Sequence, residues 1–549
     1  MLVLVVGAIG GISAALLVQL LRLVQAVAWQ GHGESFLAAT SAATGLRRWM
    51  VPALAGVMVT AAALATRRPL RGHGTASIIE SIWIRSGRLA LPWTLFRGVV
   101  SIIAVGLGAP LGREGALLQT GAATASSLGR WLDLPGDKIR LLVACGASAG
   151  IAAAYNVPIG GALFGLEVLL GSFALDLFGP IVVACVTATL VSRILVGDHP
   201  SYLIPAYQLS GPKEMTLALL LGPLVGIASA VYIRTINAFG LVLEQGSELR
   251  RTALPVVTML AIGGAAIWFP ELLGNGYDSV NGALLGKLPL TLLLVLPLMK
   301  MVATAGASGA GIPGGLFTPS LFFGALLGGA FGKLAQHFGA PVPPGAFALL
   351  AMAGTLAGTT HAAVSAVLII FELTGNYALI LPLMLTSAIS AFVSRALERE
   401  SLYSAVLQRR NVELPEPINA HWLHSAHVRD LTRPARAKTL PVASFEEVAL
   451  QLLEAPAGAD LWVVDEENRL LGVITLDQLK GHLPEHSVLD RARASDLMQS
   501  TPRLRPDMSL AEVARIFAEV PEEELPVVDK RGLLLGTVNK REVMRRGRY

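Results

Sequence analysis

Charged residues are scarce in this chain. Asp, Glu, Lys and Arg together make up 15% of its 549 residues, whereas soluble domains have roughly 25%. Hydrophobic residues make up 53%, and the mean hydropathy is +0.60. This composition excludes an ordinary soluble protein and predicts a chain that crosses a lipid membrane several times.

Cysteine and catalytic arrangements are also scarce in the apolar part. Cys145 and Cys185 both lie in apolar segments, which excludes a disulfide framework and a cysteine metal site. Neither a Ser/His/Asp nor an HExxH arrangement occurs there, so nothing in the sequence indicates an enzyme. Apart from Glu114, Glu167 and Glu372, the apolar segments supply few carboxylates, and a cation transporter needs more of them.

The excess of basic residues does not indicate nucleic-acid binding. The net charge is +5 and the pI is about 9.3, but the arginines cluster in short loops at Arg47-Arg48, Arg67-Arg68 and Arg250-Arg251. Such loops are typical of the cytoplasmic side of a membrane protein. We therefore expect a lipid membrane, and no nucleic acid, as a partner.

Apolar segments of two kinds follow one another along the chain. The long ones can each span the hydrocarbon layer, and they lie near residues 1–29, 49–66, 174–197, 214–236, 252–270, 289–305 and 377–396. The others are short or interrupted by Gly and Pro, which predicts broken helices that meet inside the protein. They lie near residues 75–85, 94–109, 114–130, 140–154, 158–172, 316–333, 343–359 and 362–376.

One interrupted segment begins with an adjacent arginine and glutamate, in Gly112–Ala116 (GREGA). Ionisable groups at membrane depth are costly and usually functional. The surrounding glycines favour a helix start, whose free amides and partial positive charge suit an anion. We predict that Glu114 is a gate, because its carboxylate can occupy such a site and vacate it on protonation. Arg113 is expected to be structural.

The apolar part contains an internal repeat. Residues 147–167 (ASAGIAAAYNVPIGGALFGLE) resemble residues 352–372 (MAGTLAGTTHAAVSAVLIIFE), and the offset is 372 − 167 = 205. Duplicated halves with interrupted helices are typical of inverted-repeat transporters, whose substrate site lies between the halves. Glu167 and Glu372 occupy equivalent helix ends, so we expect both to cap buried N–H groups.

The same offset locates a partner for the first glycine-rich helix start. Adding this offset to position 114 gives position 319, since 319 − 114 = 205. Pro319 ends a second glycine-rich segment, Gly314–Pro319. We therefore predict that the two helix starts converge on one site.

The charged tail contains a repeat of its own. The segments Trp462–Asp465 and Gly472–Thr475 return as Pro526–Asp529 and Gly536–Asn539, with 529 − 465 = 64. Each copy reads as strand, turn, strand and helix, preceded by a helix. The tail is therefore expected to hold two similar soluble α/β modules.

In this order the motifs resemble the CLC family of chloride channels and chloride/proton exchangers over essentially the whole chain. Gly112–Ala116 is similar to the family's GREGP motif, with alanine for the final proline, and Gly315–Pro319 is similar to its GxFxP motif. Tyr155–Glu167 resembles the stretch that follows, and Ser401–Tyr403 resembles the segment with the pore tyrosine. GREGA and the TTHA stretch at Thr359–Ala362 are most similar to the bacterial B-type branch of voltage-gated-type chloride channels.

The resemblance implies a fold and a set of site residues. It implies a mainly α polytopic membrane protein built on a CLC-type inverted repeat of tilted and broken helices, a homodimer with one pore per subunit, and chloride as the transported ligand without a cofactor. Glu114 would be the gating glutamate. The amides of Leu316 and Phe317, with the Tyr403 hydroxyl, would hold a central anion, and the amides of Arg113–Gly115 would hold an outer one.

Two departures from the family pattern concern transport. The family's GSGIP motif, whose serine contacts the central anion, aligns with residues 72–76. His73, between Gly72 and Gly74, replaces that serine, and we expect its N–H to contact the anion in a pH-sensitive way. Exchangers commonly carry a glutamate at the position of Val168, which favours channel-like flow here and leaves chloride/proton exchange as the alternative.

The tail resembles a pair of CBS domains, which in this family regulate from the cytoplasm and can bind adenine nucleotides. The nucleotide pattern Gly-h-h-Ser/Thr-x-x-Asp is partly met, because the first copy has Gly472 and Thr475 but Gln478 at the acidic position. The second copy has Asn539 at the hydroxyl position. A nucleotide site at Gly472 and Thr475 and a nucleotide-free regulatory or dimerisation module both stay open.

The expected organisation follows from these readings. A membrane domain is expected at residues 1–410, with repeats at about 1–200 and 213–410, then a linker at 411–424 and CBS domains at 425–486 and 491–549. We expect the bacterial inner membrane, with the CBS pair in the cytoplasm. The predicted function is regulated chloride transport, and the alternatives are a chloride/proton antiporter and a CBS-regulated cation transporter.

Overall fold

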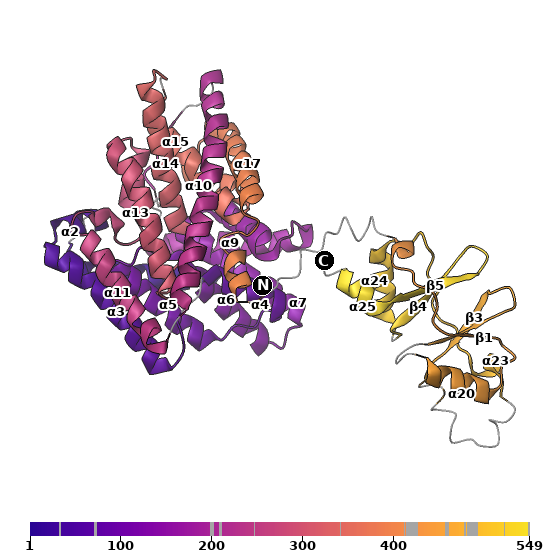
Figure 1. The fold of residues 1–549 in the computed structure, drawn as a ribbon. Helices are drawn as coiled ribbons and strands as arrows, with labels where there is room; N and C mark the ends of the chain where they lie inside the picture. The colour runs from indigo at the N-terminus through magenta and orange to yellow at the C-terminus, as the bar shows by residue number, and fades with distance from the viewer. Residues whose placement is uncertain are drawn as a thin grey trace. The chain divides into compact units, whose positions relative to one another are not determined.

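The chain divides into two compact units, residues 1–414 and 415–549. The structure is a computed structural model, and it describes residues 1–31, 35–70, 74–197, 202–207, 211–245, 247–340, 342–410, 412, 427–455, 460–476, 479, 492–520 and 522–546. In this part of the chain the first unit consists of helices, and the second combines helices with short strands (Figure 1).

The first unit is a long succession of helices. Its first half contains α1 (Leu2–Trp29), α2 (Phe36–Ala42), α3 (Gly45–Thr66), α4 (Gly74–Ile84), α5 (Leu91–Gly106), α6 (Glu114–Trp131), α7 (Gly136–Tyr155), α8 (Pro158–Phe164), the π-helical turn η1 (Gly165–Leu170) and α9 (Leu175–Val196). Its second half contains α10 (Pro212–Glu244), α11 (Glu248–Ala265), η2 (Pro270–Leu272), α12 (Tyr277–Leu284), α13 (Leu290–Gly309), α14 (Phe317–His337), α15 (Pro344–Thr360), α16 (Ala363–Thr374), η3 (Tyr377–Leu379), α17 (Ile380–Leu397) and α18 (Ser404–Arg409).

Several of these helices can cross a membrane. Among the described residues, seven are long and apolar enough, namely α1, α3, α7, α9, α10, α13 and the stretch Tyr377–Leu397. This confirms the prediction of a polytopic membrane protein. The span expected at 252–270 is shorter, because α11 ends at Ala265 and a turn follows.

The interruption expected near residues 140–154 is wrong, because α7 continues unbroken from Gly136 to Tyr155. Its glycines serve close packing rather than a break. A Cβ atom at Gly146 would lie 2.2 Å from the carbonyl oxygen of Gly121 on α6, and one at Gly121 would lie 2.1 Å from the oxygen of Gly146. The two helix backbones therefore touch directly, as in small-residue contacts between membrane helices.

The two halves of the unit repeat the same packing. In the first half α6 packs along α7 and α1 along α9, and in the second half α14 packs along α15 and α10 along α17. The offset of 205 holds at the ends of α7 and α15, where Asn156 and His361 both have a left-handed backbone. At the starts of α6 and α14 the offset is 203, since 317 − 114 = 203. Glu114 therefore corresponds to Phe317 and not to Pro319.

Glu167 and Glu372 show how the halves are joined. The Glu167 carboxylate accepts hydrogen bonds from the N–H groups of Val364 (3.3 Å) and Ser365 (2.7 Å) at the start of α16. The Glu372 carboxylate, near the end of α16, accepts from Ile159 (3.2 Å) and Gly160 (2.9 Å) at the start of α8. The expected capping role is confirmed.

These two caps also give the relative direction of the repeats. The end of the α8–η1 segment meets the start of α16, and the end of α16 meets the start of α8. The two segments therefore run antiparallel, as an inverted repeat requires.

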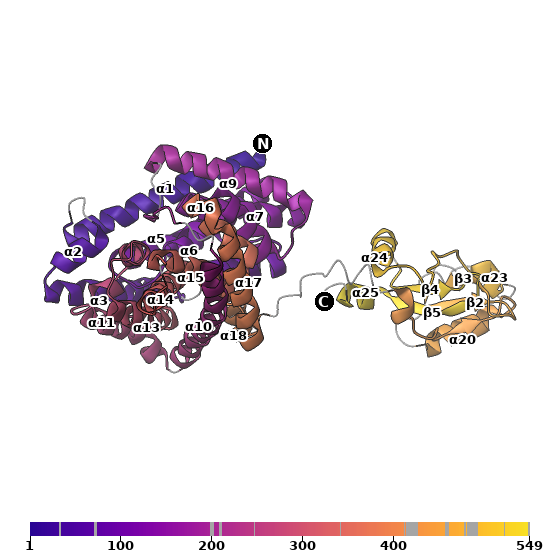
Figure 2. The ribbon, with the colours of Figure 1, turned by 90° about the horizontal axis from the view of Figure 1, so that it is seen from above.

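The site-bearing helices lie inside the first unit. The long helix α10 stands beside α13, α14, α15 and α17 (Figure 1). Seen from above, α6, α14 and α15 lie towards the middle, with α1 and α9 along one edge and α10 along the opposite one (Figure 2). Burial agrees with this arrangement, because the first turns of α6 and α14 are almost inaccessible.

The second unit contains two similar copies of a small motif. Its described elements are η4 (Val428–Asp430), β1 (Lys438–Thr439), α20 (Phe445–Glu454), β2 (Leu461–Val464), β3 (Leu470–Ile474), α23 (Ala494–Leu497), α24 (Leu510–Glu519), β4 (Glu524–Val528), β5 (Leu534–Asn539) and α25 (Lys540–Arg546). The hairpins β2–β3 and β4–β5 are both antiparallel. The predicted offset of 64 holds for them, since 534 − 470 = 64.

Matched capping boxes begin the helix of each copy. Ser444 and Glu447 cap α20, and Ser509 and Glu512 cap α24. Each serine side chain accepts from the amide three residues on, and each glutamate accepts from the serine amide, which satisfies groups left free at a helix start. The copies are joined by an apolar cluster of Trp462, Val464, Leu470, Val473, Val528 and Leu534.

Candidate functional site

Two glycine-rich helix starts meet in the first unit, as the sequence predicts. The N–H of Gly112 donates to the carbonyl of Gly315 at 2.8 Å, and the N–H of Gly315 donates to the carbonyl of Gly112 at 2.8 Å. This antiparallel bridge lies directly before α6 and α14. Residues about 200 positions apart are thereby joined at one point between the two halves.

The Glu114 side chain occupies this point. Only 2% of Glu114 is exposed. Its Oε1 accepts from the N–H of Thr318 at 2.9 Å, and its Oε2 accepts from the Thr318 hydroxyl at 2.7 Å. A Cβ atom at Gly112 or Gly315 would lie 2.1 or 2.4 Å from Oε1. A side chain at either position would therefore displace the carboxylate from this place.

The site suits negative charge. The first amides of a helix have no partner within the helix and carry a partial positive charge. Phe317 and Thr318 hold the first such positions of α14, and Glu114 and Gly115 hold those of α6. Pro319, the next residue of α14, has no backbone N–H and cannot donate to an anion. One of these amides, that of Thr318, holds the Glu114 carboxylate, and a carboxylate is one of the anions that helix starts bind.

Thr318 and Tyr155 belong to the site but were not singled out from the sequence. The hydroxyl groups of Tyr155 and Thr318 lie 2.7 Å apart. With Glu114 ionised, the Thr318 hydroxyl donates to the carboxylate, so Tyr155 must donate to Thr318. Thr318 lies within the same motif as Leu316 and Phe317. Its hydroxyl group in the first turn of a helix is the sequence feature that could have identified it as a site residue.

An aromatic chain links the two helix starts to Tyr403. The Phe317 ring lies 5.2 Å from Tyr155 and 6.1 Å from Phe164, and Phe164 lies 6.4 Å from Tyr403, measured between ring centres. Tyr403 is 3% exposed, and its hydroxyl shares a hydrogen bond with the side chain of Thr75 on α4. Tyr403 is thus buried, and one ring, that of Phe164, lies between it and Phe317.

The start of α4 lies against the start of α6. A Cβ atom at Gly74 would lie 2.6 Å from the carbonyl oxygen of Gly115, and the Gln119 amide donates to the carbonyl of Gly74 at 3.4 Å. Gly74 therefore adjoins the site, as expected. Gly72 and His73 lie outside the described residues, so the expectation for His73 stays a prediction.

Arg113 does not pair with its neighbour Glu114. Its Nη2 donates to the carbonyl of Ala154 at 3.2 Å, and its guanidinium lies 5.2 Å from the centre of the Tyr277 ring. Glu80, another carboxylate of the first unit, contacts Arg85 and Arg410 instead. The Glu114 carboxylate is therefore held by Thr318 at the start of α14 and not by Arg113.

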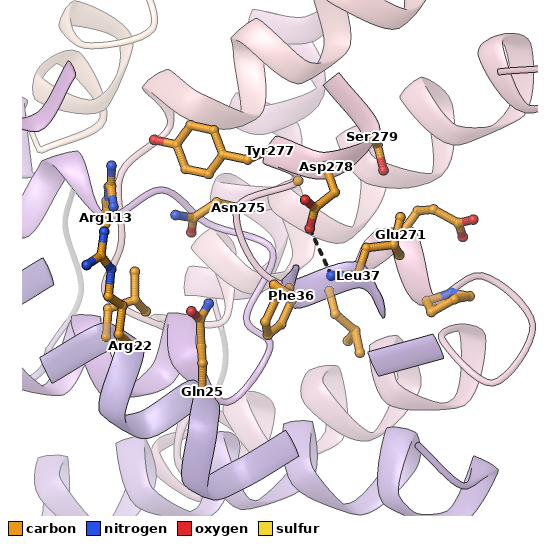
Figure 3. A pocket seen from close by; sticks show the side chains of 14 residues that line it. Arg22, Gln25, Phe36, Leu37, Arg113, Glu271, Asn275, Tyr277, Asp278 and Ser279 are labelled. Carbon is orange, nitrogen blue, oxygen red and sulfur yellow. Dashed lines mark hydrogen bonds between the residues drawn. The ribbon is translucent and has the colours of Figure 1, made fainter. Parts of the chain in front are cut away.

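Arg113 also lines two cavities, and it shares both with Arg22 of α1. The larger cavity has a volume of about 360 Å³ (Figure 3), and the smaller has about 130 Å³. Figure 3 shows Arg22 and Arg113 together at one end of the larger cavity and Asp278 away from them. The arginine end of the cavity therefore adjoins the residue that precedes Glu114.

A buried lysine supports the wall of the larger cavity. Lys300 of α13 is 1% exposed, and its ammonium donates to the carbonyls of Leu272 and Gly274, both at 2.7 Å. A buried ammonium needs such acceptors. Lys300 thereby fixes the turn that leads into Tyr277, the residue on which Arg113 stacks.

The second unit has a cavity of about 230 Å³, lined by Arg433, Pro434, Arg436, Glu524, Thr537, Asn539, Arg541 and Glu542. These residues belong largely to the second copy of the motif. Gly472 of the first copy lies in β3 against the Met498–Gln499 segment. Thr475 follows β3, and the structure leaves the nucleotide expectation for this pair as a prediction.

Comparisons with known proteins agree with this architecture. The family model for the voltage gated chloride channel matches residues 53–395, and the CBS domain model matches residues 494–548. A ClcB-like chloride channel protein of Ralstonia nicotianae is 35% identical over 391 residues, which cover 69% of this chain and 90% of that protein.

Two solved structures share the fold. A slow cyanobacterial Cl⁻/H⁺ antiporter has a TM-score of 0.68 and 22% identity, covering 74% of this chain and 97% of its own. A eukaryotic CLC transporter has a TM-score of 0.62 and 20% identity, covering 98% and 97%. With the family model matching more than half of its length and its helix starts paired around Glu114, this membrane-spanning chain belongs to the voltage-gated chloride channel (CLC) family.

Proposed function

We propose that this chain conducts chloride through a path gated by Glu114, by passive channel-like flow. The observation that carries the proposal is the Glu114 carboxylate, which takes hydrogen bonds from the first turn of α14 at the junction of the two halves. A side-chain anion in that position competes with a free anion for the same amides. Uncharged donors bind an anion while allowing it to leave.

Protonation supplies the opening step. A neutral carboxyl group loses most of its attraction to two helix N-termini, so it leaves the amides and an anion takes its place. The amides of Leu316, Phe317, Arg113 and Gly115 would hold anions along the path, with the Tyr403 hydroxyl further in. His73 and Gly72, with Gly74, would contribute from the start of α4.

Replacing Glu114 with glutamine tests the gate. Glu114→Gln keeps the shape but cannot ionise, so chloride efflux from proteoliposomes should lose its dependence on pH when the pH is varied from about 4 to about 8. At the upper end its rate should exceed that of the unmodified protein. Asp137→Asn, an exposed carboxylate in the first turn of α7, is the control. Efflux unchanged by Glu114→Gln would place the gate elsewhere.

Proton coupling is the second candidate function. The hydrogen-bonded chain from Tyr155 through Thr318 to Glu114 favours it, because a proton can be exchanged along such a chain. Val168, where exchangers commonly carry a glutamate, argues against it. A chloride gradient imposed across proteoliposomes decides the question: channel-like flow leaves the internal pH unchanged, and uphill proton movement would establish an antiporter.

The proposal extends to assembly and regulation. A homodimer in the bacterial inner membrane, with the second unit in the cytoplasm, agrees with the arginine-rich loops and with the family. The second unit would regulate flow as a CBS pair. Its cavity is lined by three arginines together with Glu524 and Glu542, and arginine side chains can bind the phosphates of an adenine nucleotide. Titration of the purified protein with ATP by calorimetry tests this point.

A further inference from the structure

The segment between α5 and α6, which leads into Glu114, is held from outside at regular intervals. We refer to this segment, Leu107–Arg113, as the gate lead. Its residues are buried up to Gly112. Every second carbonyl from the last residue of α5 onwards accepts a hydrogen bond from another part of the first unit. The donors are the Trp29 ring N–H to Gly106 (3.0 Å), the Gly274 N–H to Gly108 (3.1 Å), the Thr304 hydroxyl to Pro110 (2.8 Å) and the Gly315 N–H to Gly112 (2.8 Å).

One of these four donors is a fully buried side chain of α13, Thr304. A threonine inside a helix can donate to the carbonyl four residues before it in the same helix, as Thr120 does to Ala116 on α6. The Thr304 hydroxyl instead crosses to the carbonyl of Pro110, four residues before Glu114. An unpaired carbonyl inside a membrane is costly, so this contact fixes the gate lead against α13.

A second residue of α13 supports the gate lead indirectly. Lys300 precedes Thr304 by about one helical turn, so both lie on one face of α13. The Lys300 ammonium donates to the carbonyls of Leu272 and Gly274, both at 2.7 Å. The Gly274 N–H in turn donates to the Gly108 carbonyl. One face of α13 therefore locates two carbonyls of the gate lead, directly through Thr304 and indirectly through this turn.

The same helix is connected to the groups that hold the Glu114 carboxylate. α13 ends at Gly309 and packs against α14, which begins at Phe317. The N–H and the hydroxyl of Thr318, in the first turn of α14, bind the carboxylate. The carboxylate and its donors are thus both tied to α13, and hydrogen bonds weaken steeply when their geometry is distorted.

We propose that Thr304 is a positioning residue of the gate, because its hold on the Pro110 carbonyl sets how well the Glu114 carboxylate fits the start of α14. This inference rests on the proposed gating by Glu114 and adds a residue that acts through the gate lead. Hydrogen bonds to an ionised carboxylate favour it over the neutral form. A looser fit therefore lets protonation open the gate at higher pH.

The test is the pH dependence of chloride efflux from proteoliposomes. Thr304→Val keeps the size of the side chain but removes the donor, so efflux at neutral pH should rise roughly threefold. The pH of half-maximal efflux should move up by about 0.5, since a tenfold change corresponds to one pH unit. Thr304→Ser retains the hydroxyl and should keep the unmodified profile. Thr304→Ala removes the donor with a smaller side chain and should give the same shift, so the result does not depend on how valine packs.

Thr386→Val is the matched control. Thr386 of α17 is also fully buried, and its hydroxyl donates to the Ala218 carbonyl of α10 at 3.2 Å. The control removes an equivalent contact between two segments without touching the gate lead, so its pH profile should be the unmodified one. An equal shift in Thr386→Val and Thr304→Val would reveal a general loss of packing and overturn the positioning role.

A double variant separates positioning of the carboxylate from other effects on transport. In Glu114→Gln no carboxylate remains to be positioned, so the addition of Thr304→Val should change neither the rate nor its pH dependence. An unmodified profile of Thr304→Val, or an equal rise in both backgrounds, would contradict the positioning role and leave Glu114 as the gate. Efflux that Glu114→Gln does not change would instead refute the gate and the inference that rests on it.

Discussion

At the scale of single residues, the position of the Glu114 carboxylate depends on one hydroxyl group. The backbone N–H of Thr318 holds one carboxylate oxygen, and its side chain holds the other. A hydrogen bond to a charged group contributes about 1.5–3 kcal/mol, so this single side chain biases the gate strongly towards the occupied position. The Tyr155 hydroxyl orients the Thr318 hydroxyl through the hydrogen bond between them.

Removing that hydroxyl should loosen the gate. Thr318→Val keeps the size and the backbone donor of residue 318, but it leaves Oε2 of Glu114 without its partner. We expect chloride efflux at neutral pH to rise by about tenfold, the factor that corresponds to about 1.5 kcal/mol, the lower end of the range for a hydrogen bond to a charged group.

The matched control is Thr355→Val. The Thr355 hydroxyl of α15 is buried and has no hydrogen-bond partner among the residues that the structure describes, so its removal should not change efflux. A Thr318→Val protein with the unmodified rate and pH dependence would show that the backbone amide alone holds the carboxylate.

At the scale of secondary-structure elements, the two halves are joined through helix ends. Glu167 caps α16, and Glu372 caps α8, with Ser365 adding its hydroxyl to the first of these contacts at 2.6 Å. Free N–H groups at a buried helix start are costly inside a membrane. The reciprocal caps therefore remove this cost at both ends of one antiparallel helix pair.

Loss of either cap should destabilise the membrane unit. Glu167→Ala and Glu372→Ala should each lower the free energy of unfolding by about 1–2 kcal/mol, because two N–H groups lose their acceptor. Thermal unfolding of the purified protein in detergent, followed by circular dichroism, measures the change. Glutamine at either position retains one acceptor oxygen and should lose less, and alanine variants as stable as the original would mean that other groups satisfy these amides.

At the scale of the whole molecule, the site and the second unit are separate. Glu114, Thr318, Tyr155, Phe317 and Tyr403 all belong to the unit that ends at residue 414. The second unit has its own apolar clusters and its own cavity. All described contacts of Glu114 therefore lie within the first unit.

A protein truncated after Leu414 should still conduct anions. Residues 1–414 contain the paired helix starts and all described contacts of Glu114, so reconstituted truncated protein should retain chloride efflux that Glu114→Gln alters. A change in rate relative to the full chain would measure the regulatory contribution of the second unit. Complete loss of efflux from a correctly folded truncated protein would contradict the independence of the gate.

Part of this protein follows from sequence alone, because apolar length, glycine-rich leads and repeat offsets are local patterns. They predict the membrane unit, the tail repeat, the capping role of Glu167 and Glu372, and the meeting of the two helix starts. They place Glu114 at that meeting point because a carboxylate at membrane depth needs partners.

The tertiary structure decided which groups surround that carboxylate. The shift from 205 to 203 at the helix starts aligned Glu114 with Phe317. Only the tertiary fold brought Tyr155, the last residue of α7, to Thr318 at the start of α14. Likewise, Arg22 of α1 lines the cavities of Arg113 although the two residues lie 91 positions apart in the chain, since 113 − 22 = 91. Such contacts depend on how distant helices cross, and no local pattern of side chains encodes that crossing.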